Sequence, residues 1–227
     1  MDRNHHSIFR IELKDIFKQR DKTFLERKLL LSNFGFYKPY PNRRINSLYF
    51  DSFDNSSIFE SIEGSAKRVK KRLRWYGKLT SETFANLEYK IKNSHLSRKN
   101  IQKKFCEVNP KAMNWLSFTK SQHWRKLTRD NYSFPASIVS YDRTYYQSAN
   151  KKVRVTFDEN LTFLKQELRN SPNTANYRAL VGILVVEIKV AAVDHASVEK
   201  LQKIFPFSPK RFSKYCESLF PRKPILS

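Results

Sequence analysis

Residues 67–77, Lys-Arg-Val-Lys-Lys-Arg-Leu-Arg-Trp-Tyr-Gly, are the stretch that most restricts how this chain can fold. Their alternation predicts a β-strand. One face of that strand would carry four consecutive cations about 6.6 Å apart, Arg68, Lys70, Arg72 and Arg74. At an effective dielectric constant of about 20, each neighbouring pair repels by roughly 2–3 kcal/mol. We therefore expect water or a bound polyanion to offset the positive charge of this face.

The overall composition agrees with a strongly basic protein that folds around its own core. The 227 residues carry 44 Lys and Arg against 21 Asp and Glu, a formal net charge of +23, and 40% of them are hydrophobic. We expect a single domain over residues 1–227. The charge favours polyphosphate, nucleotide, nucleic acid or an anionic membrane surface as a partner, without choosing among them.

Cysteine usage and hydropathy predict a cytoplasmic protein. Cys106 and Cys216 lie far apart and form neither a metal-binding pattern nor a disulfide framework, which suits a reducing compartment. The longest apolar run, residues 179–186, is far too short to cross a membrane, and the start of the chain lacks the apolar core of a signal peptide.

Alternation predicts an α+β fold dominated by antiparallel strands. The strands are expected at Ile8–Lys14, Ile45–Asp51, Lys67–Tyr76, Asn86–Lys92, Ile138–Arg143, Lys152–Asp158 and Leu184–Val190. Capping signals predict helices at residues 22–31, from Asn109-Pro110 through Trp115 to Trp124, and at residues 210–219 after Ser208-Pro209.

In each predicted strand one face is apolar and the other is charged. The charged faces together hold twelve cations and only four carboxylates, Glu12, Glu88, Asp158 and Glu187. Half-exposed sheets with solvated outer faces are one interpretation. The other is a closed barrel with an apolar outer face under helices and a wet or occupied cationic interior that holds an extended phosphate chain.

Eight motifs occur in one order along the chain. They are Arg10-x-Glu12-x-Lys14, Asn46-Ser47-Leu48-Tyr49-Phe50-Asp51, Arg68-x-Lys70-x-Arg72-Leu73-Arg74-Trp75-Tyr76-Gly77, Leu87-Glu88-x-Lys90, Tyr141-x-Arg143-x-x-Tyr146, Val153-Arg154-x-Thr156-x-Asp158, Val186-Glu187-x-Lys189 and Phe212-Ser213-Lys214-Tyr215. Together they resemble the catalytic domain of the vacuolar transporter chaperone (VTC) polyphosphate polymerases, within the triphosphate tunnel metalloenzyme (CYTH-like) superfamily. The resemblance extends over residues 9–219.

This resemblance implies an antiparallel β-barrel of about eight strands that forms a cationic tunnel, with helices packed on the outside. It also implies a polyphosphate polymerase that transfers the γ-phosphate of ATP onto a growing inorganic polyphosphate chain. The implied cofactor is a divalent metal, Mn²⁺ or Mg²⁺, and the implied primer is inorganic phosphate or pyrophosphate. No nucleic acid is required, and a membrane partner protein is compatible with the family.

The resemblance also assigns roles to residues. The family positions that contact the phosphates fall on Lys14, Arg72, Arg74, Lys90, Arg143 and Arg154, and a helical lysine near one tunnel mouth falls on Lys214. Arg10, Arg68, Lys70 and Lys189 share those charged faces and are expected to contribute to phosphate binding. Glu187 matches the carboxylate that holds the divalent cation, with a structural ion pair as the alternative.

Two departures from the family pattern carry information. In the segment Ser97–Phe105, gapless placement puts Gln102 where the family has a phosphate-binding lysine, so Lys99 or Lys103 is expected to substitute. The basic run 98–104 itself is read as a solvated helix face or loop, or as an outer track for the product. Hydrolytic members begin Glu-x-Glu-x-Lys, whereas Arg10 replaces the first acid here, which disfavours hydrolysis and favours holding a long anion.

Two other functions stay open at this point. One is a tunnel-type inorganic or nucleoside triphosphatase, and the other is a non-catalytic protein that binds a polyanion or nucleic acid, for which 11 Tyr and 18 Phe among the basic residues would be suitable. Gly-rich phosphate loops, dinucleotide motifs and His-Glu-x-x-His zinc motifs are absent from the sequence.

Overall fold

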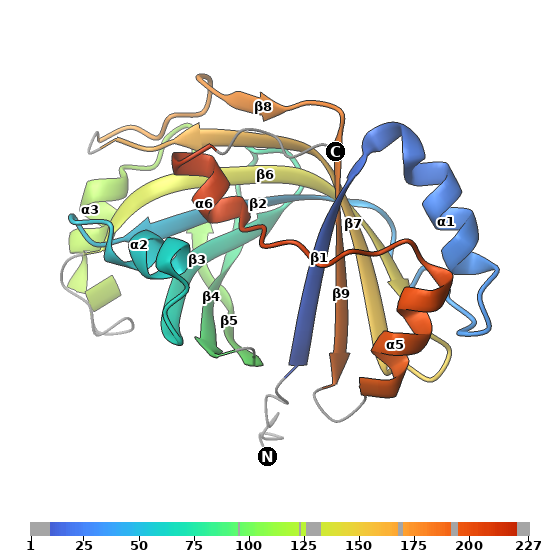
Figure 1. The fold of residues 1–227 in the computed structure, drawn as a ribbon. Helices are drawn as coiled ribbons and strands as arrows, with labels where there is room; N and C mark the ends of the chain where they lie inside the picture. Colours follow the sequence, from blue (N-terminus) through green and yellow to red (C-terminus); the bar gives the residue numbers. More distant parts are fainter. Residues whose placement is uncertain are drawn as a thin grey trace, which may run out of the picture.

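The computed structural model describes residues 10–94, 96–122, 124–125, 133–167, 170–191 and 195–221. Within these residues, nine strands form one antiparallel sheet (Figure 1). They are β1 (Arg10–Lys18), β2 (Arg43–Asp51), β3 (Lys67–Tyr76), β4 (Thr83–Asn93), β5 (Leu96–Val108), β6 (Phe134–Gln147), β7 (Val153–Lys165), β8 (Arg178–Leu180) and β9 (Ile183–Ala191). The α+β class and the dominance of antiparallel strands are confirmed.

The strand order curls the sheet into a ring of eight strands. The order is β6-β2-β3-β4-β5-β1-β9-β7-β8, and β6 also pairs with β7, which brings the two ends together. The seam between β1 and β5 consists of a single pair, Arg10 with Ser97, so the sheet is not a fully closed barrel. We call the side turned into the ring the inner face; it carries Arg72 and Arg74.

The outer face of the ring is covered by apolar clusters beneath helices, as the alternation predicts. The helices α1 (Lys22–Leu30) and α5 (His195–Ile204) lie beside β7 and β9 in Figure 1. Leu25 and Leu29 of α1 and Leu201 of α5 pack against buried residues of those strands, such as Phe157 and Ile188. A second cluster joins β2, β3, β4 and β6 to α3 (Trp115–Lys120).

Two further helices, α2 (Ser56–Glu63) and α6 (Lys214–Leu219), lie against the inner face rather than outside it. Tyr215 of α6 stacks on Tyr49 of β2, with ring centroids 4.6 Å apart, and Ile58 of α2 belongs to the same apolar cluster. Asp51 joins the two helices, because it accepts hydrogen bonds from the Ile58 amide at 3.1 Å and from the Tyr215 hydroxyl at 2.5 Å. One part of the inner face is therefore aromatic and covered.

Three sequence-based expectations about local structure are wrong. The helix expected from Asn109-Pro110 through Trp115 to Trp124 is interrupted: α3 covers only six residues, which Asn114 caps, and helical residues resume at 122 and 124–125. The helix expected from Lys210 begins at Lys214, where Ser213 accepts from the Cys216 amide. The basic run 98–104 belongs to β5; its alternation is hidden because these residues, apart from Ile101, are polar on both faces and the register shifts opposite residues 85–87.

The seven predicted strands all fall on observed strands, although β1 extends to Lys18 and β7 to Lys165. Residues 8 and 9 of the first predicted strand lie outside the described residues. In the part of the chain that the structure describes, no helix has the length and apolar character needed to cross a membrane.

The contact between Tyr215 and Asp51 yields a stability prediction. Burial and the neighbouring Asp51 raise the pKa of Tyr215, so its hydroxyl remains a donor at neutral pH. Tyr215→Phe removes one hydrogen bond to a buried carboxylate and should lower the free energy of unfolding by about 1.5–3 kcal/mol. Urea denaturation measures the loss, and Tyr177→Phe, whose side chain is 64% exposed, is the matched control. Equal stability of both variants would contradict this anchoring role.

Candidate functional site

Charged side chains from seven strands and α6 converge on the inner face of the ring. Eight cations share four carboxylates there, and we call this set the ionic cluster. Its cations are Lys14, Arg72, Arg74, Lys90, Lys99, Arg143, Lys189 and Lys214, and its carboxylates are Glu12, Glu88, Asp158 and Glu187. The sequence prediction that these groups turn toward a common interior is thereby supported by their contacts.

Glu88 of β4 gathers cations from both neighbouring strands. The Arg72 Nε and Nη2 atoms each lie 2.8 Å from Glu88 Oε2, and Arg74 Nη1 lies 3.6 Å from the same oxygen. Lys99 of β5 contacts the other oxygen at 2.6 Å. The register of the sheet produces this arrangement, because Arg72 stands opposite Glu88 and Lys99 stands opposite the next inward residue, Lys90.

Glu12 and Glu187 form a second centre on β1 and β9. Lys90 Nζ lies 2.7 Å from both Glu12 oxygens, and Lys14 Nζ lies 3.1 Å from Glu12 and 3.5 Å from Glu187. Lys189 Nζ completes the set at 2.5 Å from Glu187. The two carboxylates therefore share Lys14, while each keeps a lysine of its own.

Asp158 of β7 forms the third centre and is completely buried. Arg143 of β6 donates two hydrogen bonds to this carboxylate, from Nε at 2.5 Å and from Nη2 at 2.7 Å. Lys214 of α6 donates to the same carboxylate at 2.5 Å. The helix that covers part of the inner face thus contributes a cation to the site.

All four carboxylates are held in their ionised form. Burial alone would raise their pKa values, but the surrounding cations outweigh it: the pKa values of Glu12 and Glu187 lie well below their usual range, and those of Glu88 and Asp158 are also lowered. Because the carboxylates are already charged and still outnumbered, the ionic cluster carries surplus positive charge. A polyanion is the ligand that this surplus favours.

Tyrosines and a serine that the sequence reasoning left without a role orient the arginines. The Tyr49 hydroxyl accepts from Arg72 at 2.7 Å, and Arg74 donates to Ser47 at 3.2 Å and to Tyr141 at 3.3 Å. Burial would raise the pKa of Tyr49, yet the nearby cations lower it. The alternation within residues 46–51 places Ser47 and Tyr49 on one face and could have indicated this support.

The remaining predicted residues lie less deeply in the site. Lys70 has no carboxylate partner among the described residues; it donates to Ser213 at 2.9 Å, and burial lowers its pKa. Arg68 donates to the Ser65 carbonyl at 2.6 Å. Arg154 stands opposite Lys189 without a described contact, and Lys103 is exposed. The side chain of Arg10 lies outside the described residues.

Geometry favours Lys99 over Lys103 as the inner-face lysine of β5. Lys99 points to Glu88 on the inner face, whereas Gln102 stands opposite Leu87, an outward residue of the apolar cluster. Lys99 is therefore the better substitute for the lysine that the family pattern expects. The contact of Lys99 with Glu88 and the exposure of Lys103, rather than spacing in the sequence, decide between the two.

A divalent cation fits the Glu12 and Glu187 centre only with help from a ligand. No group of three or more His, Cys, Asp or Glu side chains gathers among the described residues. Glu187 lies close enough to Glu12 for its charge to raise the pKa of the Glu12 carboxyl group. Two carboxylates suit Mg²⁺ or Mn²⁺ when phosphate oxygens and water supply the other ligands.

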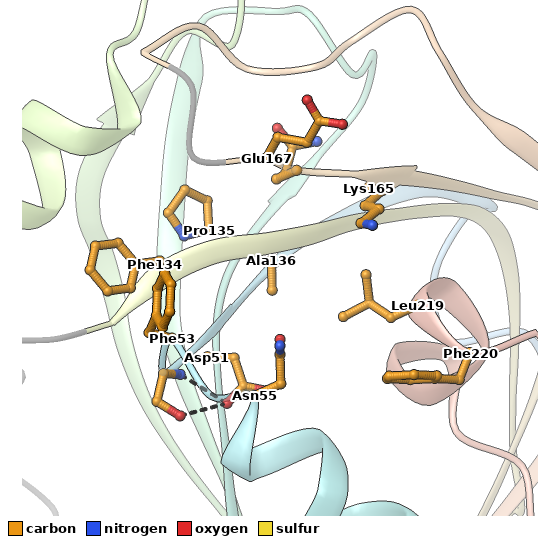
Figure 2. Close-up of a pocket in the computed structure, with 12 residues that line it drawn as sticks. Asp51, Phe53, Asn55, Phe134, Pro135, Ala136, Lys165, Glu167, Leu219 and Phe220 are labelled. Carbon is orange, nitrogen blue, oxygen red and sulfur yellow. Dashed lines mark hydrogen bonds between the residues drawn. The ribbon is translucent and has the colours of Figure 1, made fainter.

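A separate hollow of about 400 Å³ lies near the end of β2 and the starts of α2 and β6 (Figure 2). Phe53, Phe134 and Leu219 are among its lining residues, and Asp51 accepts a hydrogen bond there from the Ser52 amide at 2.9 Å. None of the predicted site residues lines it. The ionic cluster, not this hollow, is the candidate functional site.

Comparison with known proteins agrees with this geometry. The family described as VTC domain matches residues 10–220. A solved structure of a putative adenylyl cyclase from Hippeastrum, described as having a dominant triphosphatase activity, is 12% identical, with a TM-score of 0.50 and coverage of 96% of this chain and 99% of that chain. A putative adenylate cyclase from Vibrio parahaemolyticus is 11% identical, with a TM-score of 0.52 and coverage of 94% and 99%. Among curated proteins, none matches the chain by sequence.

Lys99 gives the site a testable pH dependence. Burial, with Arg74 and Arg72, lowers the pKa of Lys99 to about 7, while Glu88 acts in the opposite direction. A bound phosphate chain favours the protonated form of Lys99. Above pH 7 this amine is mostly neutral in the free protein, so tripolyphosphate binding is accompanied by uptake of a proton. This group alone should weaken tripolyphosphate binding about fivefold between pH 7 and pH 8.

Isothermal titration calorimetry with tripolyphosphate at both pH values measures this loss. Lys99→Arg is the matched variant, because arginine keeps its charge over this range. The variant should lose less affinity than the native protein between the two pH values. Identical pH profiles for the two proteins would show that Lys99 does not titrate on binding.

Proposed function

Because this chain belongs to the VTC domain family, we propose that it is a polyphosphate polymerase that uses ATP. The observation that carries the proposal is the ionic cluster, in which eight cations share four carboxylates on the inner face. In the proposed reaction, a terminal oxygen of the polyphosphate chain attacks the γ-phosphorus of ATP. The bond from this phosphorus to the β–γ bridging oxygen breaks, and ADP leaves.

This reaction asks for little covalent chemistry from the protein. Phosphoryl transfer is accelerated mainly by positioning and by neutralising the equatorial phosphate oxygens. Arg72 and Arg143 are suited to this, since each guanidinium is already fixed by a carboxylate and by aromatic neighbours. Their side chains therefore lose little rotamer freedom when a phosphate binds.

A divalent cation would be held by Glu187, with Glu12 beside it, and would supply charge neutralisation at the phosphates. Lys14 stands between these two carboxylates and would contact both a phosphate and the ligands of the metal. Inorganic phosphate or pyrophosphate would serve as primer, because each presents the terminal oxygen that the first transfer requires.

Hydrolysis of triphosphates is the second candidate. It is supported by the likeness of the fold to a protein described as having a dominant triphosphatase activity. Arg10 argues against it, because a cation stands where hydrolytic members of the superfamily have an acid. Binding of nucleic acid has less support, since the cations of β3 and β4 turn inward to shared carboxylates.

Incubation of the protein with ATP and Mn²⁺, followed by gel electrophoresis, tests the proposal. We expect a polymer that exopolyphosphatase degrades, and Arg72→Ala/Arg74→Ala should reduce its formation at least about 100-fold. Arg20→Ala/Arg27→Ala removes the same charge from exposed positions around α1 and should retain activity. Free phosphate without a polymer would identify the hydrolase, and full activity of the Arg72/Arg74 variant would refute the assigned site.

Glu187→Gln separates metal-dependent chemistry from binding of the phosphate chain. The substitution removes a carboxylate from the metal centre, frees Lys189 from its partner and leaves Lys14 paired only with Glu12. We expect loss of Mn²⁺-dependent turnover, while tripolyphosphate binding without metal stays equal or becomes tighter. Turnover and calorimetry measure the two effects; unchanged turnover would show that Glu187 is only a structural ion-pair partner.

A further inference from the structure

Three tyrosines surround one arginine where β2 begins. The guanidinium carbon of Arg43 lies 4.9 Å from the ring centroid of Tyr40, 5.7 Å from that of Tyr76 and 6.0 Å from that of Tyr145. The rings of Tyr40 and Tyr145 meet edge to face at 5.5 Å. These four residues come from the loop before β2 and from strands β2, β3 and β6, and we call them the Arg43 cluster.

The Arg43 cluster directly continues the ionic cluster along the inner face. Tyr76 is the next inward residue of β3 after Arg74, and Arg43 stands opposite Arg143 in the pairing of β2 with β6. The guanidinium of Arg143 lies 5.8 Å from the ring centroid of Tyr145, on which Arg43 also packs. A molecule bound to Arg143 or Arg74 would thus reach the Arg43 cluster without leaving this face.

Arg43 differs from the arginines of the ionic cluster in having no polar partner. Among the described residues, no carboxylate, carbonyl or hydroxyl accepts a hydrogen bond from its guanidinium, which contacts only aromatic rings. Tyr40 and Tyr76 are 41% and 39% exposed, whereas Tyr145 is buried. Two aromatic surfaces and five N–H donors are therefore available to a ligand.

We propose that the Arg43 cluster binds the nucleobase of the nucleoside triphosphate. This inference rests on the proposed function, which places the triphosphate among the cations next to it. Nucleobases stack on tyrosine rings and on the planar guanidinium of arginine, and the free N–H groups of Arg43 can donate to acceptor atoms at the edge of the base. An inorganic phosphate chain offers none of these flat surfaces.

The placement also sets the direction of the substrate. Tyr76 and Lys70 are six residues apart on β3, which separates them by about 20 Å along the strand. With the base at Tyr76, the α- and β-phosphates follow toward Arg74 and Arg72. The γ-phosphate then points toward the Lys14 and Lys90 centre, and the acceptor chain approaches from the Lys70 end.

A comparison of two ligands tests the base site separately from the tunnel. A non-hydrolysable ATP analogue and inorganic tripolyphosphate share the phosphate chain, but only the analogue carries a base. Stacking on an aromatic ring contributes about 1–3 kcal/mol per base, which corresponds to about 5- to 140-fold in affinity. Calorimetry on the native protein and on Tyr40→Ala/Tyr76→Ala should therefore show that much loss for the analogue and less than about twofold change for tripolyphosphate.

Two further variants control the comparison. Tyr177→Ala removes a more exposed tyrosine outside the cluster and should bind both ligands as the native protein does. Tyr40→Phe/Tyr76→Phe keeps the rings and should restore binding of the analogue. If the double alanine variant fails to fold, the single variants Tyr40→Ala and Tyr76→Ala, both at exposed positions, replace it in the same titrations.

The outcomes distinguish failure of the proposed base site from failure of the proposed phosphate-binding site. Equal weakening of both ligands would show that the cluster acts on the phosphates or on the fold, and an unchanged affinity for the analogue would place the base elsewhere. Either result overturns the base site and leaves the tunnel intact. Failure of the native protein to bind tripolyphosphate would overturn the proposed function and this inference together.

Discussion

The rest of this structure depends on one constraint: the eight cations of the ionic cluster share only four carboxylates. Like charges on neighbouring inner-face positions repel, and a buried cation without a partner is costly. Four carboxylates reduce this repulsion but do not cancel it, since Glu88 alone serves Arg72, Arg74 and Lys99. The protein therefore holds its cations in fixed positions while leaving a net positive field for a ligand.

This arrangement requires support from outside the site. The apolar clusters beneath α1, α5 and α3 hold the strands in register, and register determines which charges face one another. On the inner face, α6 contributes in two ways: Tyr215 anchors it to Asp51, and Lys214 reaches Asp158. Stability of the fold and charge at the site are thus linked through one short helix.

Much of the site could be predicted from local alternation. Residues 67–76 form the predicted strand, and the inward direction of Arg72 and Arg74 follows from period two alone. The partners of these arginines could not be predicted in the same way. Glu88 meets Arg72 through strand register, and Lys214 meets Asp158 across 56 residues of sequence.

The failures have equally local causes. Apart from Ile101, residues 98–104 are polar on both faces, and Lys104 has a positive φ of 45° beside the register shift, so β5 lacks the alternation that identifies a strand. The Arg43 cluster could not be predicted from the sequence, because Tyr40, Tyr76 and Tyr145 are far apart in the chain and meet only when β2 pairs with both β3 and β6. Long-range pairing, not residue type, creates that surface.

A crystal structure of the protein with inorganic tripolyphosphate would show whether the ionic cluster binds a phosphate chain. We expect phosphorus atoms on the inner face, within reach of Arg72, Arg143 and Lys90, with the carboxylates still in place beside them. Tripolyphosphate bound instead to the exposed basic side chains of β5, Arg98, Lys103 and Lys104, with the ionic cluster unchanged, would contradict this expectation.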